Sequence, residues 1–218
     1  MNNRYQIKTL REQVYGYIKS KIMNGEIKPG EKINEYEFAK ELGISRGPVR
    51  EALRQIEQEG LVQYMPNRGC MVTQLTDKEM YEMGMIRANL EMLAADVCEG
   101  NFSDATIHIL EQCVDEMEKY EKEKALEKVI EADQKFHEAI VKEPGLLHLQ
   151  KLWHTLDGTN VAIFFCRNYD GRLCESFLVS KNHRRFVEGI KTKELDRIKK
   201  ELKWHYMGAV TYADVISM

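Results

Sequence analysis

The segment from Ser45 to Gly60, SRGPVREALRQIEQEG, constrains the fold of this 218-residue chain more than any other stretch. It predicts one helix with two different faces. Apolar residues recur at helical spacing along one face: Val49, Ala52, Leu53 and Ile56. Arginines recur every fourth residue along a second, cationic face: Arg46, Arg50 and Arg54. Ser45 is a favourable N-cap, and Gly60 follows the expected end of the helix. Such a helix suits the DNA major groove, where guanidinium groups bind phosphates and guanine edges.

The flanking residues complete a helix-turn-helix with a wing. A two-turn helical pattern covers residues 35–42, and Gly43 with Ile44 makes a tight corner into the arginine-bearing helix. Beyond that helix, the sequence predicts a strand over Leu61 to Tyr64, a turn over 66–69 and a returning strand over Cys70 to Thr73. An arginine stripe alone would favour a solvated surface helix. The helix, the corner and the hairpin in this order favour DNA binding.

Residues 21–72 carry a set of motifs in a fixed order. They are Gly25, Pro29-Gly30, Phe38-Ala39, Leu42 to Arg46, Pro48 to Leu53, Glu59 to Leu61, and Arg68-Gly69. Together they closely resemble the winged-helix domain of GntR-type bacterial transcription regulators. The resemblance implies DNA contacts from Ser45, Arg46, Arg50, Arg68 and Gly69, and the cationic stripe adds Arg54. Two positions depart from the family: Gly47 stands where threonine is usual, and Tyr36 where some members have arginine.

Charge is distributed unevenly along the chain, whose net charge is −3. Residues 1–76 carry 12 Lys and Arg against 9 Asp and Glu, and the remainder carries 20 against 26. A basic part joined to an acidic part predicts a DNA reader joined to a second domain. We therefore expect a DNA-binding domain over residues 1–75 and an effector domain over 76–218.

The composition also bears on the compartment. Five cysteines occur without a C-x-x-C pair, which indicates a reduced, cytoplasmic chain. Residues 1–10 are polar and predict no signal peptide. No apolar run approaches the roughly 20 residues that a membrane span needs, so we expect no membrane association.

Helical periodicity dominates the chain outside the wing. Thr76 and Glu79 form a capping-box signature at the start of the second domain. The expected helices cover residues 7–23 near the N-terminus and then 77–99, 104–122, 125–142, 146–168, 172–190 and 193–215. The predicted fold is therefore mainly α: a winged helix-turn-helix followed by an all-α bundle of six to seven helices.

Four polar residues stand among apolar neighbours in the second domain. Asp133 and His137 lie one turn apart on a face shared with Phe136. For an isolated pair, a mutual hydrogen bond is the simpler interpretation. His183 and His205 lie mid-helix beside apolar residues and add two imidazoles from two further helices. Three imidazoles and one carboxylate form a suitable ligand set for a divalent transition metal such as zinc, nickel or manganese.

The same half of the chain resembles the FCD domain, the all-helical sensor of the FadR subgroup of GntR regulators. Arg87-x-x-x-Glu91, Asp133-x-x-x-His137, His183 and His205 match its pattern in order. The resemblance implies that the Asp and His positions are metal ligands, as in metal-binding members. Arg87 has two interpretations, an ordinary helix pair with Glu91 or a clamp for an anionic ligand, and the resemblance favours the clamp. The chain departs at Lys191 to Lys193, where the family usually has Gly-Asp.

These observations predict a bacterial transcription regulator of the repressor type, and not an enzyme. It would bind a palindromic double-stranded operator as a homodimer. A small organic-acid effector would complete the coordination of the metal and change DNA affinity. Two alternatives remain open at this point: a metal-dependent, hydrolase-like enzyme with a DNA-binding appendage, and a regulator that senses acyl ligands without a metal.

Overall fold

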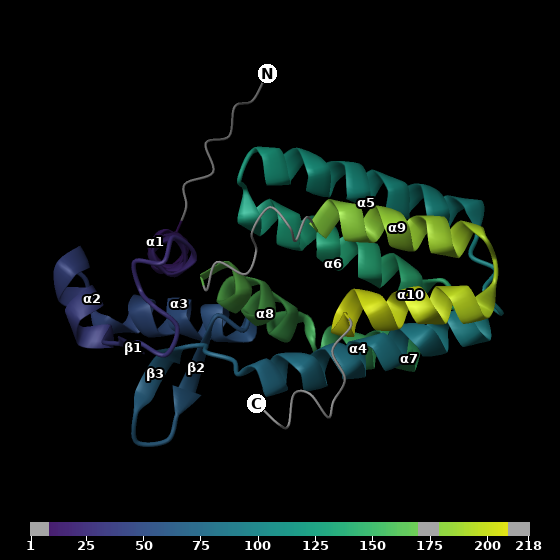
Figure 1. Cartoon of the computed structure of the whole chain (residues 1–218). Coiled ribbons are helices and arrows are strands. Elements are labelled where there is room, and N and C mark those ends of the chain that lie inside the picture. Colours follow the sequence, from purple (N-terminus) through teal and green to yellow (C-terminus); the bar gives the residue numbers. More distant parts are fainter. Residues whose placement is uncertain (1–8, 170–178, 209–218) are drawn as a thin grey trace. The chain divides into compact units, whose positions relative to one another are not determined.

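The computed structural model of the chain describes residues 9–169 and 179–208 (Figure 1). These residues divide into two compact units. The first unit comprises residues 9–74 with 161–169, and the second comprises residues 75–160 with 179–208. The sequence predicted a single boundary after residue 75, and this domain division stays a proposal. In the structure, residues 161–169 group with the first unit although they follow that boundary. No helix among the described residues has the length and apolar character needed to cross a membrane.

The first unit is a winged helix-turn-helix. Its elements are α1 (Leu10–Met23), β1 (Lys32–Ile33), α2 (Glu35–Leu42), α3 (Arg46–Gln58), β2 (Val62–Met65) and β3 (Gly69–Val72). The three strands form an antiparallel sheet in the order β1-β3-β2. Val62 pairs with Val72, and Met65 pairs with Gly69 at the tip of the hairpin. The predicted wing is confirmed, with each strand shifted by one residue. The strand β1 was not predicted because two residues carry no periodicity.

Apolar burial fixes α3 against the rest of this unit. Its four apolar residues, which the helical spacing placed on one face, are fully buried: Val49, Ala52, Leu53 and Ile56. Helix α3 packs against α1, whose Ile18 and Ile22 are also fully buried. Between α2 and α3, Gly43 adopts the left-handed conformation with φ 66°, which costs glycine little and most residues more. The predicted corner is therefore present, and it leaves the arginine face of α3 toward solvent.

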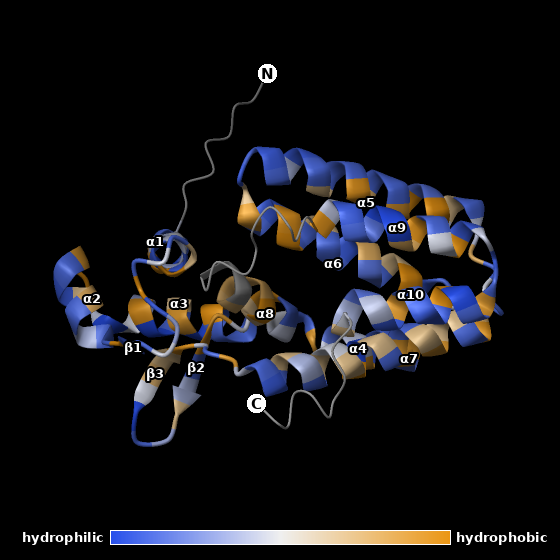
Figure 2. Cartoon of the chain, in the orientation of Figure 1, coloured by the Kyte–Doolittle hydropathy of each residue, from blue (hydrophilic) through white to orange (hydrophobic). Residues whose placement is uncertain are grey.

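Within the described residues, seven helices follow the wing. They are α4 (Asp77–Val97), α5 (Asp104–Lys122), α6 (Leu126–Lys142), α7 (Leu147–His154), α8 (Asp157–Tyr169), α9 (Val179–Lys191) and α10 (Leu195–Met207). In the second unit, α5 packs against α6 and α9, and α10 packs against α4 and α9 (Figure 1). Hydrophobic and hydrophilic residues recur by turns along these helices, as expected for an amphipathic bundle (Figure 2). The predicted mainly α fold is confirmed.

The predicted helix over 146–168 is instead two helices. The break falls at Thr155 and Leu156, where backbone bonds tighten: the Thr155 N–H donates to the Leu152 carbonyl, and the Leu156 N–H to the Trp153 carbonyl. The Thr155 hydroxyl also donates to the Leu152 carbonyl at 2.6 Å. A Thr hydroxyl that bonds its own preceding turn competes with helix continuation. The predicted segments 172–178 and 209–215 lie outside the described residues.

Two glycines let α10 lie close to its neighbours. A Cβ on Gly84 of α4 would meet the Tyr206 backbone oxygen at 3.2 Å, and a Cβ on Gly189 of α9 would meet Glu201 Cγ at 3.0 Å. Both distances are tighter than ordinary contact. The hydrogen atoms of Gly84 and Gly189 thus permit the approach of α10, which carries His205.

Candidate metal centre and DNA-reading helix

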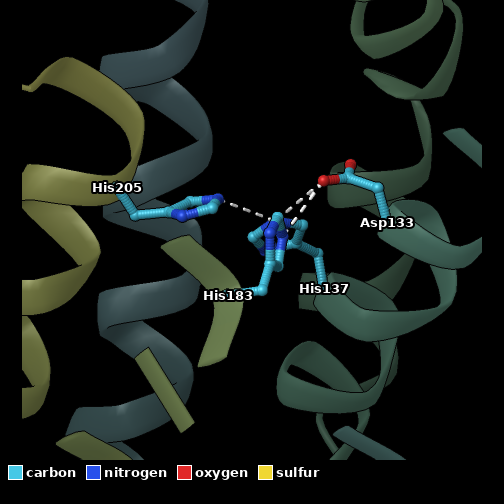
Figure 3. A group of neighbouring side chains, drawn as sticks. All are labelled: Asp133, His137, His183 and His205. Carbon is cyan, nitrogen blue, oxygen red and sulfur yellow. Dashed lines mark hydrogen bonds and ion pairs between the residues drawn. The ribbon is translucent and has the colours of Figure 1, made fainter. Parts of the chain in front are cut away.

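The four predicted metal ligands converge on one point of the second unit (Figure 3). Asp133 and His137 come from α6, His183 from α9 and His205 from α10. The Nε2 atom of His137 lies 3.2 Å from His183 Nε2 and 3.1 Å from His205 Nε2. Asp133 Oδ1 lies 3.1 Å from His183 Nε2 and 3.7 Å from His137 Nε2. Asp133, His137 and His183 are buried, and His205 is partly exposed.

These spacings fit a bound ion. An ion that holds tetrahedral nitrogens at about 2.0–2.1 Å separates them by roughly 3.3 Å, close to the spacings found here. Neutral imidazoles carry one proton each, so three Nε2 atoms that face one another cannot all be satisfied by mutual hydrogen bonds. A cation with nitrogen and oxygen ligands removes this conflict. The cluster can therefore hold a metal ion.

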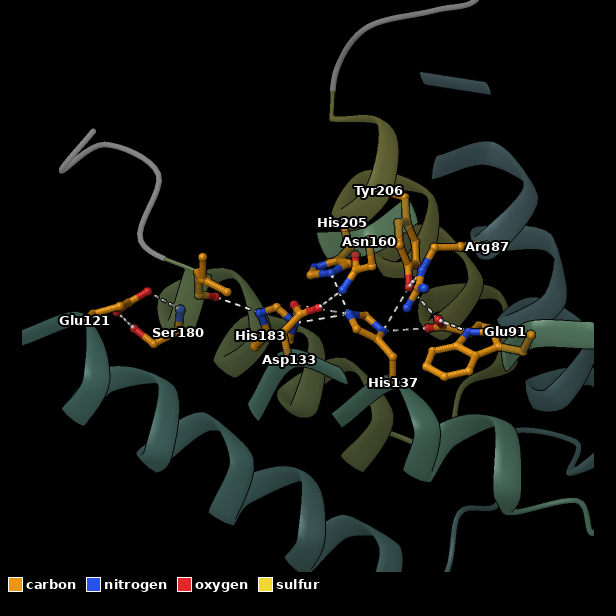
Figure 4. Close-up of polar contacts among 12 residues, drawn as sticks. Arg87, Glu91, Glu121, Asp133, His137, Asn160, Ser180, His183, His205 and Tyr206 are labelled. Atoms are coloured by element: carbon orange, nitrogen blue, oxygen red, sulfur yellow. Dashed lines mark hydrogen bonds and ion pairs between the residues drawn. The ribbon is translucent and has the colours of Figure 1, made fainter. Parts of the chain in front are cut away.

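Hydrogen bonds on the far side of two imidazoles aim their Nε2 atoms at the centre (Figure 4). His137 Nδ1 lies 2.8 Å from Glu91 Oε2, and His183 Nδ1 lies 2.8 Å from the Val179 carbonyl oxygen. A carboxylate and a carbonyl oxygen only accept, and the Tyr206 hydroxyl, 3.1 Å from His137 Nδ1, gives its own proton to Glu91. Each Nδ1 therefore carries the proton, and each Nε2 keeps its lone pair. This arrangement is typical of metal-binding histidines. His205 Nδ1 is buried and has no hydrogen-bond partner among the described residues.

The electrostatics keep Asp133 and His205 in their metal-binding forms. Burial opposes ionisation of Asp133, but His137, His183 and a 2.8 Å hydrogen bond from Asn160 outweigh it and lower the pKa of the carboxyl group. Asp133 is therefore a carboxylate. Burial, together with the neighbouring His183 and His137, lowers the pKa of His205 well below its usual value. Its imidazole is therefore neutral.

Arg87 of α4 lies beside this cluster with unpaired donors (Figure 4). Its side chain is buried, and its Nε donates to the Tyr206 hydroxyl at 3.3 Å. Its Cζ lies 4.4 Å from the centroid of the Trp153 ring. Both terminal nitrogens are buried without a hydrogen-bond partner among the described residues. Glu91 accepts instead from His137, from Trp153 Nε1 at 3.1 Å and from the Tyr206 hydroxyl.

Four residues of this site were not assigned there by sequence reasoning. Glu91 was considered only as a partner of Arg87, and Trp153 was given no role in the site. Asn160 and Tyr206 were not singled out. Tyr206 directly follows His205, so a polar aromatic beside a predicted ligand was the signal available. Nothing comparable in the sequence pointed to Asn160, because its partner lies 27 residues away on another helix.

Helix α3 of the first unit carries three arginines with exposed side chains, Arg46, Arg50 and Arg54. The side chains of Arg46 and Arg50 are half-exposed and share the carboxylate of Glu35. Arg54 is exposed and lines an open hollow of about 460 Å³ together with Arg50. Ser45 is the N-cap of α3 by position, but its hydroxyl makes no capping hydrogen bond. That hydroxyl is therefore not occupied by the helix end.

The two wing candidates lie at the hairpin tip. The Arg68 N–H donates to the Met65 carbonyl at 3.1 Å, which closes the turn between β2 and β3. Asn67 and Gly69 have positive φ values of 61° and 84°. Asparagine and glycine tolerate this conformation best. Arg68 and Gly69 are both exposed, as a DNA-contacting tip requires.

Comparisons with known proteins agree on both units. Residues 10–72 match the profile of bacterial regulatory proteins of the gntR family, and residues 79–207 match the FCD domain. The uncharacterized HTH-type transcriptional regulator YdhC of Bacillus subtilis (strain 168) is 37% identical over 198 residues, 89% of this chain and 86% of that protein. The gluconate operon transcriptional repressor of Bacillus licheniformis is 26% identical over 87% of this chain and 79% of its own. A putative GntR transcriptional regulator from Rhodococcus sp. RHA1 shares the fold, with a TM-score of 0.67 and 20% identity over 95% of this chain and 97% of that one.

Proposed function

We propose a mechanism for this chain, which belongs to the gntR family of bacterial regulatory proteins and is a DNA-binding transcription regulator with an FCD domain. A small carboxylate effector, bound at a metal site in the helical domain, controls the affinity of the protein for its operator. The regulator works by binding, catalyses no reaction and acts in the bacterial cytoplasm, where its DNA lies. The observation that carries this mechanism is the Asp133–His137–His183–His205 cluster, of which the first three ligands are buried. Beside it lies Arg87, whose two terminal nitrogens are buried without a hydrogen-bond partner among the described residues.

The DNA-binding surface in this proposal is the cationic face of α3 with the wing tip. Half-exposed arginines on a helix whose other face is fully buried fit recognition in the major groove. Arg46, Arg50 and Arg54 would contact bases and phosphates from α3, with Ser45 at its start. Arg68 and Gly69 would contact the backbone from the wing.

The exposed face of α4 supports the proposal of a homodimer on a palindromic operator. Three apolar residues of α4 are 46–48% exposed: Ile86, Leu93 and Val97. They recur at spacings of seven and four residues and form one stripe. A second copy that covers this stripe would give a two-fold dimer, and two-fold proteins bind two-fold operators.

Asp133, His137, His183 and His205 would hold one divalent ion, with zinc, nickel or manganese compatible with the ligand set. When bound, such an ion supplies a positive charge and coordination positions beyond the four protein ligands. The effector would be an anion that fills one of these positions. Arg87 would bind its second oxygen, because a guanidinium with two free terminal nitrogens matches a carboxylate.

The class of effector is a small hydroxy or sugar acid. The relative from Bacillus licheniformis is named for a gluconate operon, which favours this class. A metal-free acyl sensor fits less well, since a lipid tail supplies no partner for the three imidazole Nε2 atoms that face one another. A hydrolase also fits less well, because Glu91, the further carboxylate beside the cluster, is already held by three donors.

The experiment begins with protein purified without chelator and analysed for metal. We expect about one divalent ion per chain in the wild type and none in the double variant His183→Ala/His205→Ala. His148→Ala is the matched control, since this histidine is exposed on α7, away from the cluster. Calorimetry with gluconate and related acids should show binding only to the metal-loaded wild type. A wild type that takes up no metal even after reloading, or acid binding that survives metal removal, would refute the mechanism.

A further inference from the structure

Glu35, the first residue of α2, joins the DNA-reading helix to the wing. Its Oε2 accepts from Arg46 Nη2 at 3.2 Å, from Arg50 Nε at 3.2 Å and from Arg50 Nη2 at 3.0 Å. Its Oε1 accepts from the Tyr64 hydroxyl on β2 at 3.1 Å. The Glu35 side chain is only 13% exposed, whereas those of Arg46 and Arg50 are 56% and 50% exposed. One largely covered carboxylate thus holds two exposed guanidinium groups.

The Glu35 carboxyl group is ionised at neutral pH. Burial acts to raise the pKa of Glu35, but the hydrogen bonds from Arg50, Arg46 and Tyr64 prevail and lower it. Glu35 is therefore an anion within the proposed DNA-binding surface. A negative charge at this place weakens attraction to phosphate in general, so it needs a role that offsets the loss.

That role is visible in the pose of Arg50. The open hollow of about 460 Å³ beside its guanidinium leaves the side chain room to move, so packing alone does not fix it. Glu35 fixes it by holding Nε and one terminal nitrogen, which leaves the Nη1 side of the fork free for DNA. An arginine that is already oriented loses less entropy when it binds a base edge in one geometry.

We propose that Glu35 is a specificity-determining positioning residue, which orients Arg46 and Arg50 for the operator and opposes their use as general phosphate contacts on other DNA. This inference rests on the proposed DNA contacts of Arg46 and Arg50. Phosphate contacts carry no sequence information, whereas oriented base contacts do. A residue that restrains the first kind and supports the second raises the ratio of operator affinity to non-operator affinity.

The test uses the full-length protein and two duplexes. One is an operator selected by the wild type from a random duplex library, and the other is a scrambled duplex of the same composition. Glu35→Gln removes the charge at constant size. Glu37→Gln is the matched control, because it makes the same charge change two residues along α2 at an exposed position. Glu35→Asp keeps the charge but shortens the side chain by one methylene.

For Glu35→Gln we expect the ratio of operator to scrambled affinity to fall roughly tenfold or more relative to Glu37→Gln, the scale of one bidentate base contact. The slope of log affinity against log salt on the scrambled duplex should steepen by about one, since a released arginine neutralises one more phosphate. A merely structural role would change neither the slope nor this ratio. Glu35→Asp should lose operator affinity without gaining scrambled affinity, which separates orientation from charge.

The failure of the inference is distinguishable from failure of the proposed function. Arg50→Ala is measured in parallel. If Arg50→Ala leaves operator binding unchanged, the DNA contact itself is wrong. If Arg50→Ala weakens operator binding while Glu35→Gln behaves as Glu37→Gln in both ratio and slope, the positioning role of Glu35 is wrong and the contact stands. Thermal melting of each variant verifies that the comparison is made between folded proteins.

Discussion

Replacing Glu91 by glutamine keeps the size of the side chain but turns one of its two acceptor oxygens into a donor. The carboxylate accepts from His137 Nδ1 at 2.8 Å, from Trp153 Nε1 at 3.1 Å and from the Tyr206 hydroxyl. A glutamine side chain has one oxygen, so it cannot accept from His137 and from Trp153 at the same time. If its oxygen faces His137, its amide faces the Trp153 N–H, which has no other role than donor. If its oxygen faces Trp153, the His137 imidazole must move its proton to Nε2 and ceases to be a ligand.

The first orientation costs less, and its magnitude follows from the contacts. A buried donor left without a partner destabilises the fold by about 1–3 kcal/mol. His137 keeps its tautomer but loses an anionic partner, and such losses typically weaken metal affinity about 10–100-fold, or roughly 1.4–2.7 kcal/mol. For Glu91→Gln we therefore expect lower stability of the metal-free protein together with weaker metal binding.

Metal affinity can be measured by competition with a coloured chelator, and stability by thermal melting of metal-free and metal-loaded protein. Glu138→Gln is the matched control, since this neighbour of His137 is partly exposed and pairs with Lys142 at 2.7 Å and with His154 at 3.3 Å, not with the metal ligands. We expect it to bind metal within about twofold of wild type, as surface ion pairs contribute little. Equal affinities for Glu91→Gln and Glu138→Gln would show that Glu91 does not support His137 as a ligand.

Three further predictions concern single residues. Arg50→Ala should weaken operator binding by about 1–3 kcal/mol in a gel-shift titration with the melting temperature unchanged, and unchanged affinity would contradict the proposed reading role of α3. Gly47→Ala should raise the free energy of unfolding by roughly 0.5–1 kcal/mol in urea denaturation, because this exposed site in the first turn of α3 is open, with Ser45 Oγ the nearest atom to an added Cβ at 3.9 Å. Gly84→Ala should weaken metal binding, because the added Cβ would meet the Tyr206 backbone oxygen at 3.2 Å and displace α10, which carries His205. A metal affinity equal to that of the wild type in the chelator competition would contradict this prediction.

The sequence predicted those features whose signal is local. The four buried apolar residues and three arginines of α3 follow from helical spacing within 13 residues. The corner between α2 and α3 was predicted from Gly43, because glycine adopts the left-handed conformation at little cost. Asp133 and His137 share a face because they lie one turn apart. Convergence with His183 and His205 depends on packing between helices, and only the family resemblance supplied it.

Features that depend on distant partners escaped prediction for a physical reason. Trp153 is fully buried, as its apolar body predicts, but its indole N–H finds Glu91 62 residues away. Tyr206 reaches Glu91 across 115 residues. Periodicity shows which face of a helix points inward and does not show which polar atoms meet there. The break at Thr155 escaped because the hydrophobic pattern of α7 and α8 continues across it.

Adjacent residues of α10 serve the two halves of the site. His205 faces the ligand cluster, and Tyr206 contacts Arg87 and Glu91. An ion that engages His205 and an anion that engages Arg87 therefore act on the same turn of one helix. Thermodynamic linkage makes this reciprocal: the factor by which the ion changes affinity for the anion equals the factor by which the anion changes affinity for the ion. Under the proposed function, the effector therefore changes DNA affinity only in a cell that also supplies the metal.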